Sequence, residues 1–346
     1  MRVLVTGGFG NVGMSAVRAL LAAGCEVCVF EHPSAKNRHQ RRLRELIRDS
    51  RGRVKIFYGN ITSEEALSEA MSCAGGNGPD AVIHLAGIIP PLADEKPELA
   101  TTINVGGTRA LLNVCSCIHP SPRIVFASSI ALYGDRLASP MISVSDTLAP
   151  NDTYSRTKME CETALQKSGL EWTVLRLSYV VSSDWLPFSP LLFEVPPSTH
   201  FEVVHTEDAG RAFAHAAMIG GKGRAFNIGG GTSCRTTYRA YLDRLMRCFG
   251  LGSATFLPDD LFASGNFHCG WYSDSQEAED LLHFRSKSLE DYYSEVSWRM
   301  RFARPLGSIV GWAVKPWIRS LSPYRGGVRP ARSPRLVGEI AEYRRR

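Results

Sequence analysis

The stretch RVLVTGGFGNVG, residues 2–13, places a run of apolar and β-branched residues directly before a glycine-rich loop. Such a run is typical of a parallel strand that is buried on both faces. Gly7, Gly10 and Gly13 match the spacing G-x-x-G-x-x-G, and residues 14–26 then follow with helical periodicity. The stretch therefore predicts a strand, a tight loop and the start of a helix in direct succession.

This loop has the composition of a dinucleotide-binding site. A pyrophosphate needs close approach of the backbone, which a Cβ would obstruct, and a helix N-terminus offers it free N–H groups. The next apolar strand, VCVFE, ends in Glu31, eighteen residues beyond Gly13. A carboxylate there accepts hydrogen bonds from ribose hydroxyls and repels a 2′-phosphate, so it favours NAD over NADP. Lys36 and Arg38 follow closely and leave NADP open.

Strand and helix patterns continue to alternate as far as residue 129. Apolar strands separated by helices indicate a parallel sheet with helices on both faces, so we expect a Rossmann-like, doubly wound α/β fold. Ligands bind such sheets beyond the carboxyl ends of the strands. The residues predicted at these ends are Gly7, Glu31, Asn60, Gly87 and Ser129. Five segments of the chain are thus expected to converge on one edge of the sheet.

A polar stretch, NDTYSRTKMECE at residues 151–162, places Tyr154 four residues before Lys158. Asn151 and Asp152 are good N-cap residues, so we expect a helix to begin just before the tyrosine. Positions i and i+4 share one face of a helix. The spacing alone is equally compatible with two solvated residues on a surface helix, so other motifs must decide whether it is functional.

The composition is that of an ordinary globular protein. The chain has 346 residues, of which 44% are hydrophobic and 21% charged, and this excludes a disordered or fibrous protein. No run of eighteen apolar residues predicts a spanning helix, and the apolar start of the chain breaks into glycines as a strand would, unlike a signal peptide. The nine scattered cysteines lack metal-site spacing, so we expect reduced thiols in a cytoplasmic protein and no metal.

The net charge of +6 is unevenly distributed along the chain. Residues 299–346 carry a net charge of +10, which leaves −4 for the remaining 298 residues. A second basic cluster, at residues 35–49, is interpreted as a solvated helix face, and no nucleic-acid partner is predicted. The basic character of the protein therefore belongs to its C-terminal tail.

Within this tail, apolar residues recur at helical spacing. They are Leu306, Val310, Ala313, Trp317 and Leu321, with Pro316 expected to kink or break the helix. The sequence leaves two interpretations open. The stripe either docks on the protein's own small lobe or makes a peripheral contact with a membrane surface, to which the arginines of the tail would contribute.

Taken in order, the motifs resemble those of the extended short-chain dehydrogenases/reductases, the NAD-dependent epimerase/dehydratase group, over residues 1 to about 295. The matching pieces include TGGFGNVG, HLAG at 84–87, NVGGT at 104–108, FASSIALYGD at 126–135, YSRTK at 154–158 and VVHTEDAGRA at 203–212. The resemblance implies a dinucleotide-binding core over residues 1–175, to which 203–230 return. Residues 176–298 would form mainly a substrate lobe, and 299–346 a basic amphipathic or disordered tail.

The resemblance also implies roles for individual residues. Tyr154 would be the acid/base, Lys158 would bind the nicotinamide ribose and lower the pKa of the phenol, and Ser129 would bind the substrate oxygen. Ser128 is expected to face the other side of its strand. Asp208 is expected to N-cap a helix, and Asn104 is either functional or a structural brace. The expected NAD contacts are Gly7, Gly10, Asn11, Val12, Gly13, Glu31, Asn60, Ile61, Leu85, Ala86, Gly87, Tyr154 and Lys158.

The activity implied is hydride transfer at a secondary alcohol or ketone carbon, by an NAD(P)-dependent dehydrogenase/reductase or an epimerase. The apolar stretch at residues 182–201 lacks arginine and lysine, which a nucleotide diphosphate would need, and so disfavours a UDP-sugar 4-epimerase. Its Trp185, Phe188, Leu191, Leu192 and Phe193 either line a substrate pocket or pack the small lobe.

Two further expectations concern the molecule as a whole. The alternative to an enzyme is a catalytically silent NAD(P)-binding regulator or scaffold. Such a protein would not need the serine, the tyrosine and the lysine together. The resemblance also implies a homodimer that pairs the helices near residues 100–117 and 153–168.

Overall fold

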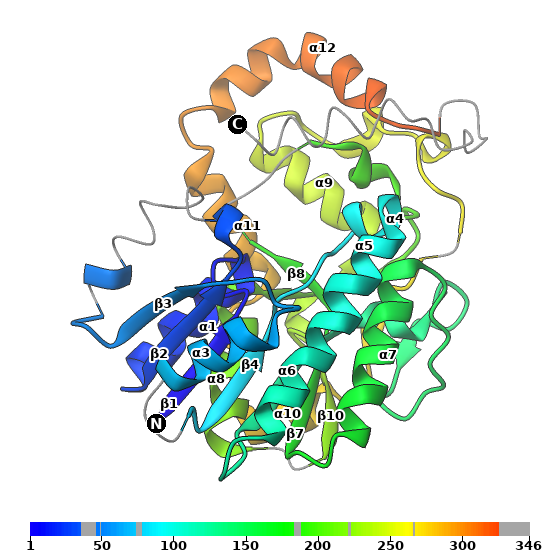
Figure 1. The fold of residues 1–346 in the computed structure, drawn as a ribbon. Coiled ribbons are helices and arrows are strands. Elements are labelled where there is room, and N and C mark those ends of the chain that lie inside the picture. The colour runs from blue at the N-terminus through cyan, green and yellow to red at the C-terminus, as the bar shows by residue number, and fades with distance from the viewer. Residues whose placement is uncertain are drawn as a thin grey trace.

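The computed structural model describes residues 1–35, 46–48, 50–73, 78–182, 188–220, 223–265 and 267–324. A seven-stranded sheet forms its centre, with the strand order β10-β7-β5-β4-β1-β2-β3 (Figure 1). All neighbouring strands in it are parallel. The strands are β1 (Arg2–Thr6), β2 (Glu26–Glu31), β3 (Val54–Tyr58), β4 (Ala81–His84), β5 (Arg123–Ser129), β7 (Trp172–Leu177) and β10 (Arg224–Ile228). The expected Rossmann-like α/β fold is confirmed.

Helices cover both faces of this sheet, and each face has its own apolar cluster. On one face lie α1 (Asn11–Ala22), α8 (Thr206–Ile219) and α10 (Ser275–Leu282). On the other lie α3 (Glu64–Cys73), α6 (Gly107–Ser116) and α7 (Thr153–Lys167). The helix α8 and the strand β10 belong to this core, and α10 packs on the same face as α8.

A smaller lobe is built on a three-stranded sheet with the order β11-β9-β8. Its elements are β8 (Tyr179–Val181), β9 (His200–His205), β11 (Arg235–Thr237), α9 (Tyr238–Cys248), α11 (Leu289–Arg299) and α12 (Arg304–Ser320). Shorter elements include α4 (Leu92–Glu95), α5 (Pro97–Thr101), β6 (Met141–Ile142) and β12 (Trp271–Tyr272). No helix among the described residues is long and apolar enough to cross a membrane.

The apolar stretch before β9 packs the small lobe. Phe193 is fully buried in the lobe's core, and Phe188 and Leu192 pack against that core. These three side chains therefore pack the small lobe, which is one of the two alternatives that the sequence left open. Leu191 is exposed, and Trp185 lies outside the described residues.

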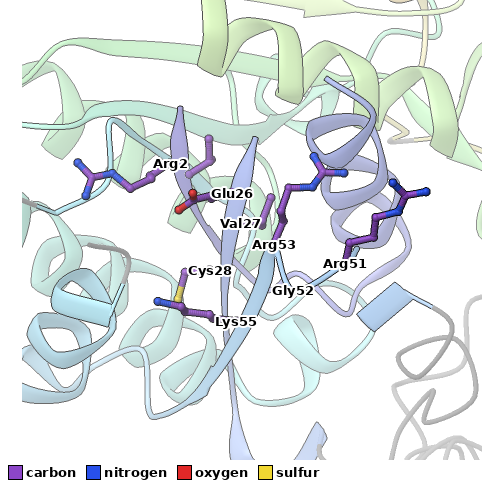
Figure 2. Close-up of a pocket in the computed structure, with 9 residues that line it drawn as sticks. Arg2, Glu26, Val27, Cys28, Arg51, Gly52, Arg53 and Lys55 are labelled. Atoms are coloured by element: carbon purple, nitrogen blue, oxygen red, sulfur yellow. The ribbon is translucent and has the colours of Figure 1, made fainter. Parts of the chain in front are cut away.

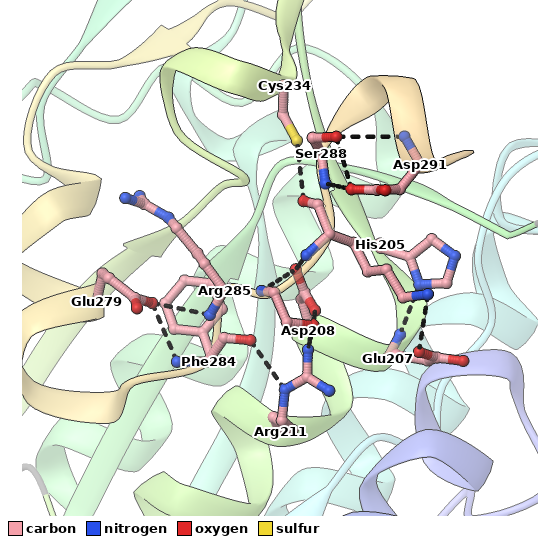
Figure 3. Close-up of polar contacts among 12 residues, drawn as sticks. His205, Glu207, Asp208, Arg211, Cys234, Glu279, Phe284, Arg285, Ser288 and Asp291 are labelled. Carbon is pink, nitrogen blue, oxygen red and sulfur yellow. Dashed lines mark hydrogen bonds and ion pairs between the residues drawn. The ribbon is translucent and has the colours of Figure 1, made fainter. Parts of the chain in front are cut away.

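The start of α8 differs from the expectation. The N-cap is His205, whose ring accepts a hydrogen bond from the Glu207 N–H at 3.2 Å. Asp208 lies one turn further on, fully buried, and accepts hydrogen bonds from the N–H groups of Ser286 (3.1 Å) and Lys287 (3.0 Å) (Figure 3). The prediction that Asp208 is an N-cap is wrong, because this carboxylate fastens the loop between α10 and α11 to α8.

The basic segments are only partly described. Most of the cluster at 35–49, and the tail from residue 325, lie outside the described residues. The predicted helix of the tail is present as α12, and it continues through Pro316 instead of breaking there. The eight cysteines whose side chains are described are free, as expected. The described residues contain no cluster of histidine, cysteine and carboxylate groups that could hold a metal.

Candidate active site

The carboxyl edge of the main sheet brings the predicted site residues together. Gly7 directly follows β1, Glu31 ends β2, and Asn60 lies just beyond β3. Gly87 lies just beyond β4, and Ser129 ends β5. The five strands are neighbours in one parallel sheet, so these positions lie along a single edge, as the sequence predicts.

The glycine loop folds tightly against the segment after β4. Gly7 has φ of 71°, and a Cβ on it would lie 2.7 Å from the Ala86 nitrogen. The N–H of Phe9 donates to a carboxylate oxygen of Glu31 at 3.0 Å, which ties the loop to the end of β2. Gly10 is the N-cap of α1 and has no side chain to satisfy the first-turn N–H groups. These features fit a dinucleotide. The loop lets a pyrophosphate approach the backbone N–H donors closely, and a carboxylate that could bind a ribose lies beside it.

The fit around Gly13 can be tested with a single methyl group. A Cβ on Gly13 would lie 2.3 Å from the Gly7 carbonyl oxygen, so Gly13→Ala is expected to lower the free energy of unfolding by about 1–3 kcal/mol through overpacking. Gly106→Ala is the matched control, because it adds the same methyl group to a helical position with nothing within 4 Å. Urea denaturation of both variants checks this. If Gly13→Ala and Gly106→Ala were equally stable, the close approach of Gly13 to the Gly7 carbonyl would be contradicted.

The helix α7 begins as predicted. Asp152 is its N-cap and accepts from the Ser155 N–H at 2.6 Å, while the Ser155 hydroxyl oxygen accepts from the Asp152 N–H at 3.2 Å. Lys158 is buried on this helix, and its ammonium donates to the Ala127 carbonyl of β5 at 2.7 Å. The same nitrogen lies 5.9 Å from the centre of the Tyr154 ring. The tyrosine and the lysine therefore face the carboxyl end of β5 together.

The Ser129 hydroxyl lies close to the Tyr154 phenol and favours its ionised form. Burial nevertheless raises the pKa of this phenol to about 12. Charge complementarity predicts that the Lys158 ammonium and an oxidised nicotinamide together bring this pKa down. The chain's own residues do not do so, because desolvation outweighs every other influence on the phenol.

Ser128 turns away from this group, as expected. Its hydroxyl donates to a carboxylate oxygen of Glu162 at 2.5 Å on the buried side of β5. Arg176, on β7, donates from Nη2 to the other oxygen of Glu162 at 2.8 Å. The sequence analysis missed Glu162, although its position four residues after Lys158 on the same helix face could have indicated it.

A second buried group that the sequence analysis missed lies behind Lys158. His84, the last residue of β4, forms hydrogen bonds with the hydroxyls of Thr6 at 2.7 Å and Thr108 at 3.0 Å. Burial and the nearby Lys158 charge lower the pKa of its imidazole to about 3, so the ring is neutral at physiological pH. The ring thereby links β1, β4 and α6 without adding charge beside the lysine.

Asn104 acts as a brace. Its side-chain oxygen accepts from the Ile88 N–H at 2.7 Å, and its amide nitrogen donates to the Ile88 carbonyl and to the Thr157 hydroxyl, both at 3.0 Å. These bonds hold the segment after β4 against α7. A Cβ on Gly87 would lie 3.8 Å from the Lys158 ammonium, so this segment passes directly beside the lysine.

The remaining predicted cofactor contacts fall into two environments. Asn60 is exposed and its side-chain oxygen accepts from the Thr62 N–H at 3.1 Å, whereas Ile61 is buried beneath α6. Asn11 and Val12 begin α1 directly after the glycine loop, and Leu85 and Ala86 directly follow β4. All of them lie on the carboxyl edge that carries the glycine loop.

A cavity of about 270 Å³ lies at the opposite edge of the same sheet (Figure 2). Its lining includes Arg2 at the start of β1, Glu26 at the start of β2, and Arg53 and Lys55 around the start of β3. These are the amino ends of the strands. The cavity is therefore separate from the predicted site.

Comparisons with known proteins agree with this arrangement. The model of the NAD dependent epimerase/dehydratase family matches residues 3–189. The chain is 34% identical to UDP-glucose 4-epimerase 4 of Oryza sativa subsp. japonica over 182 residues, 51% of this chain and 48% of that protein. It is 30% identical to D-erythronate dehydrogenase of Cupriavidus necator over 184 residues, 51% of this chain and 54% of that protein. The chain spans about half the length of the curated relatives it matches.

Solved structures share the fold over most of the chain. The UDP-glucose-4-epimerase from Stenotrophomonas maltophila, with bound NAD and formylated UDP-arabinopyranose, has a TM-score of 0.72 at 20% identity and covers 89% of this chain and 99% of its own. A dTDP-glucose 4,6-dehydratase from Streptomyces venezuelae has a TM-score of 0.72 at 23% identity, over 88% of this chain and 98% of its own. Since the family model covers more than half of the sequence, the chain belongs to the NAD dependent epimerase/dehydratase family.

Proposed function

We propose that the protein is an NAD(P)-dependent enzyme that transfers hydride at a secondary alcohol or ketone carbon, with Tyr154 as its acid/base. The observation that carries this proposal is the meeting of the Ser129 hydroxyl, the Tyr154 phenol and the Lys158 ammonium at the sheet edge that bears the glycine loop. A silent regulator would not need these three groups together, and this argues against the alternative of another class.

The chain's own residues divide the chemistry among them. The Tyr154 phenol moves a proton to or from the substrate oxygen, and the Ser129 hydroxyl holds that oxygen in place. Lys158 keeps a positive charge beside the phenol, while the glycine loop and Glu31 bind the adenosine half of the cofactor. A bound nicotinamide would supply the hydride acceptor or donor.

The cofactor is proposed to be NAD rather than NADP. Glu31 is expected to make NAD bind at least about tenfold more tightly than NADP, because a 2′-phosphate would meet its carboxylate. Titration of both oxidised cofactors measures the preference. Glu31→Gln should narrow it, and Glu26→Gln, at the other end of the same strand, should leave it unchanged.

Tighter binding of NADP by the wild-type protein would contradict this assignment. So would a preference that Glu31→Gln leaves intact. Lys36 and Arg38, which could favour NADP, lie outside the described residues.

Two substrate classes are candidates for this enzyme. A dehydrogenase/reductase acting on a non-nucleotide substrate is supported by the lack of arginine and lysine in residues 182–201 and by the likeness to D-erythronate dehydrogenase. A sugar-nucleotide 4-epimerase is supported by the likeness to UDP-glucose 4-epimerases. Incubation with NAD and either D-erythronate or UDP-glucose separates them, because the first reaction accumulates NADH and the second yields an epimer without net redox change.

We further propose a cytoplasmic homodimer. Seven of the eight described cysteine side chains are buried thiols, which supports a reducing compartment. The helices α6 and α7 lie side by side on the outside of the main sheet, where a two-fold axis could pair them with their copies (Figure 1). Light scattering at micromolar concentration is expected to give twice the mass of the chain, and the mass of one chain would contradict the dimer.

A further inference from the structure

The most exposed large apolar side chains of the described residues gather in one short segment. In descending order of exposure they are Trp312 (81%), Phe302 (78%), Ile309 (69%), Trp298 (65%) and Leu306 (59%). They lie at the end of α11, in the turn after it and on α12, which runs along the outer edge of the small lobe (Figure 1). Large exposed apolar patches are rare on monomeric soluble proteins, so we expect this patch to contact another molecule.

The small lobe itself does not cover this face. The helix α12 docks on the lobe through a different stripe: Gly307, Gly311, Val314 and Ile318. A Cβ on Gly307 would lie 2.1 Å from the Phe249 carbonyl oxygen, so the helix backbone rests directly on α9's end. This contact fixes the orientation of α12.

The apolar stripe predicted from the sequence therefore mostly points outward. Leu306, Val310, Ala313 and Trp317 are all exposed, and Leu321 is half-buried against the lobe. Trp317 also makes an edge-to-face contact with Phe188, with ring centres 6.3 Å apart. The interpretation that the stripe docks on the small lobe is wrong for its first three residues and only partly right for Trp317.

The segment from residue 297 to 324 carries charges of one sign. Residues 297–324 include no aspartate or glutamate, and they contain five cations: Arg299, Arg301, Arg304, Lys315 and Arg319. The guanidinium of Arg301 lies 4.0 Å from the centre of the Trp298 ring and 4.5 Å from that of Phe302. Cations and exposed aromatic rings are thus interleaved on one surface.

We propose that this face, formed by Trp298, Phe302 and the outward side of α12, docks on the surface of an anionic lipid bilayer. Aromatic rings are favoured at the boundary between lipid headgroups and acyl chains, and neighbouring arginines and lysines are attracted to anionic headgroups. A helix with an apolar face and cations beside it lies in the plane of that boundary without crossing it. The proposal does not depend on the catalytic activity.

Other occupants fit the charges less well. A second copy would bring the same five cations against this face. Residues 325–346 contain seven arginines and two glutamates, so the chain's own tail carries the same sign of charge. A lipid surface of opposite sign meets both the apolar and the charged part of the face.

Co-sedimentation of the full chain with vesicles tests the proposal. One vesicle preparation contains phosphatidylcholine alone, and the other contains phosphatidylcholine with phosphatidylserine. The wild-type protein is expected to pellet with the second and far less with the first, and added salt should weaken this binding. The triple variant Phe302→Ser/Ile309→Ser/Trp312→Ser should bind at least about tenfold more weakly.

Ile219→Ser is the matched control, because Ile219 is 54% exposed at the end of α8, away from this face. It should pellet as the wild type does. Lys315→Gln/Arg319→Gln should reduce the binding to anionic vesicles, and circular dichroism confirms that each variant is folded. Failure of the wild type to bind either vesicle would overturn the proposal. If the triple variant bound anionic vesicles as well as the wild type does, the proposal would be overturned in favour of binding through the tail. If the wild type were a dimer that the triple variant dissociates, a second copy of the chain would be the occupant.

Discussion

Tyr154→Phe is expected to lower kcat by roughly 10²–10⁴-fold while NAD still binds. The substitution removes the phenol oxygen, which is the atom of this side chain that exchanges the proton, and keeps the aromatic ring. In the proposed site, the glycine loop and Glu31 would hold the adenosine half of the cofactor elsewhere on the sheet edge, so the affinity for NAD should not change. Steady-state turnover and a separate NAD titration measure the two effects.

A matched tyrosine distinguishes this effect from a general loss of packing. Tyr293, on α11, is also buried, and burial raises the pKa of its phenol as well, yet it lies in the small lobe. Tyr293→Phe should retain activity within about a factor of two. Activity of Tyr154→Phe in that same range would refute the proposed acid/base.

Arg176→Met is expected to lower the free energy of unfolding by about 3–5 kcal/mol. The Arg176 and Glu162 side chains are only 6% and 3% exposed, and the guanidinium also donates to the Tyr133 hydroxyl at 2.9 Å. Removing the arginine leaves the Glu162 carboxylate charged and buried, with the Ser128 hydroxyl as its remaining partner among these groups. Urea denaturation near neutral pH measures the loss.

An exposed ion pair supplies the control for this prediction. The Arg244 and Glu290 side chains are 51% and 70% exposed, so Arg244→Met should cost less than about 1 kcal/mol. The double variant Arg176→Met/Glu162→Met should recover much of the lost stability, because it leaves no lone buried charge. If Arg176→Met lost no more stability than Arg244→Met, the prediction that the buried ion pair stabilises the fold would be contradicted.

Much of the fold and of the site follows from local sequence. A buried parallel strand, a glycine turn and a helix start are each encoded within a few residues, and Gly7, Glu31 and Ser129 lie where those patterns place them. Parallel strands align their carboxyl ends, so local strand predictions also predict which residues share an edge. The Tyr154–Lys158 pair follows from helical spacing in the same way.

The parts that the sequence could not supply depend on contacts between distant segments. Glu162 bonds to Ser128 and Arg176, which come from two different strands, and no spacing rule links the three. Likewise, the docked side of α12 is chosen by the fit of Gly307 against Phe249. Periodicity predicts an apolar stripe on this helix, but it does not show which of two adjacent stripes packs against the small lobe.

The pKa of Tyr154 is a further case. Charge alone suggested that Lys158 would favour the phenolate, and the sequence contains no measure of how far the phenol is removed from water. Burial decides the direction, and it raises the pKa to about 12. The site as the chain builds it therefore holds the phenol in its protonated form at neutral pH.

The central claim is that this site performs hydride transfer with Tyr154 as the acid/base. It is tested most directly by incubating wild-type and Tyr154→Phe protein with NAD and a panel of secondary alcohols and sugar nucleotides, with NADH absorbance and product mass and stereochemistry followed together. The account predicts that the wild type converts at least one substrate class, and that Tyr154→Phe binds NAD but converts none at a comparable rate. Equal conversion by both proteins, or a wild type that binds NAD and converts nothing in the panel, would contradict it.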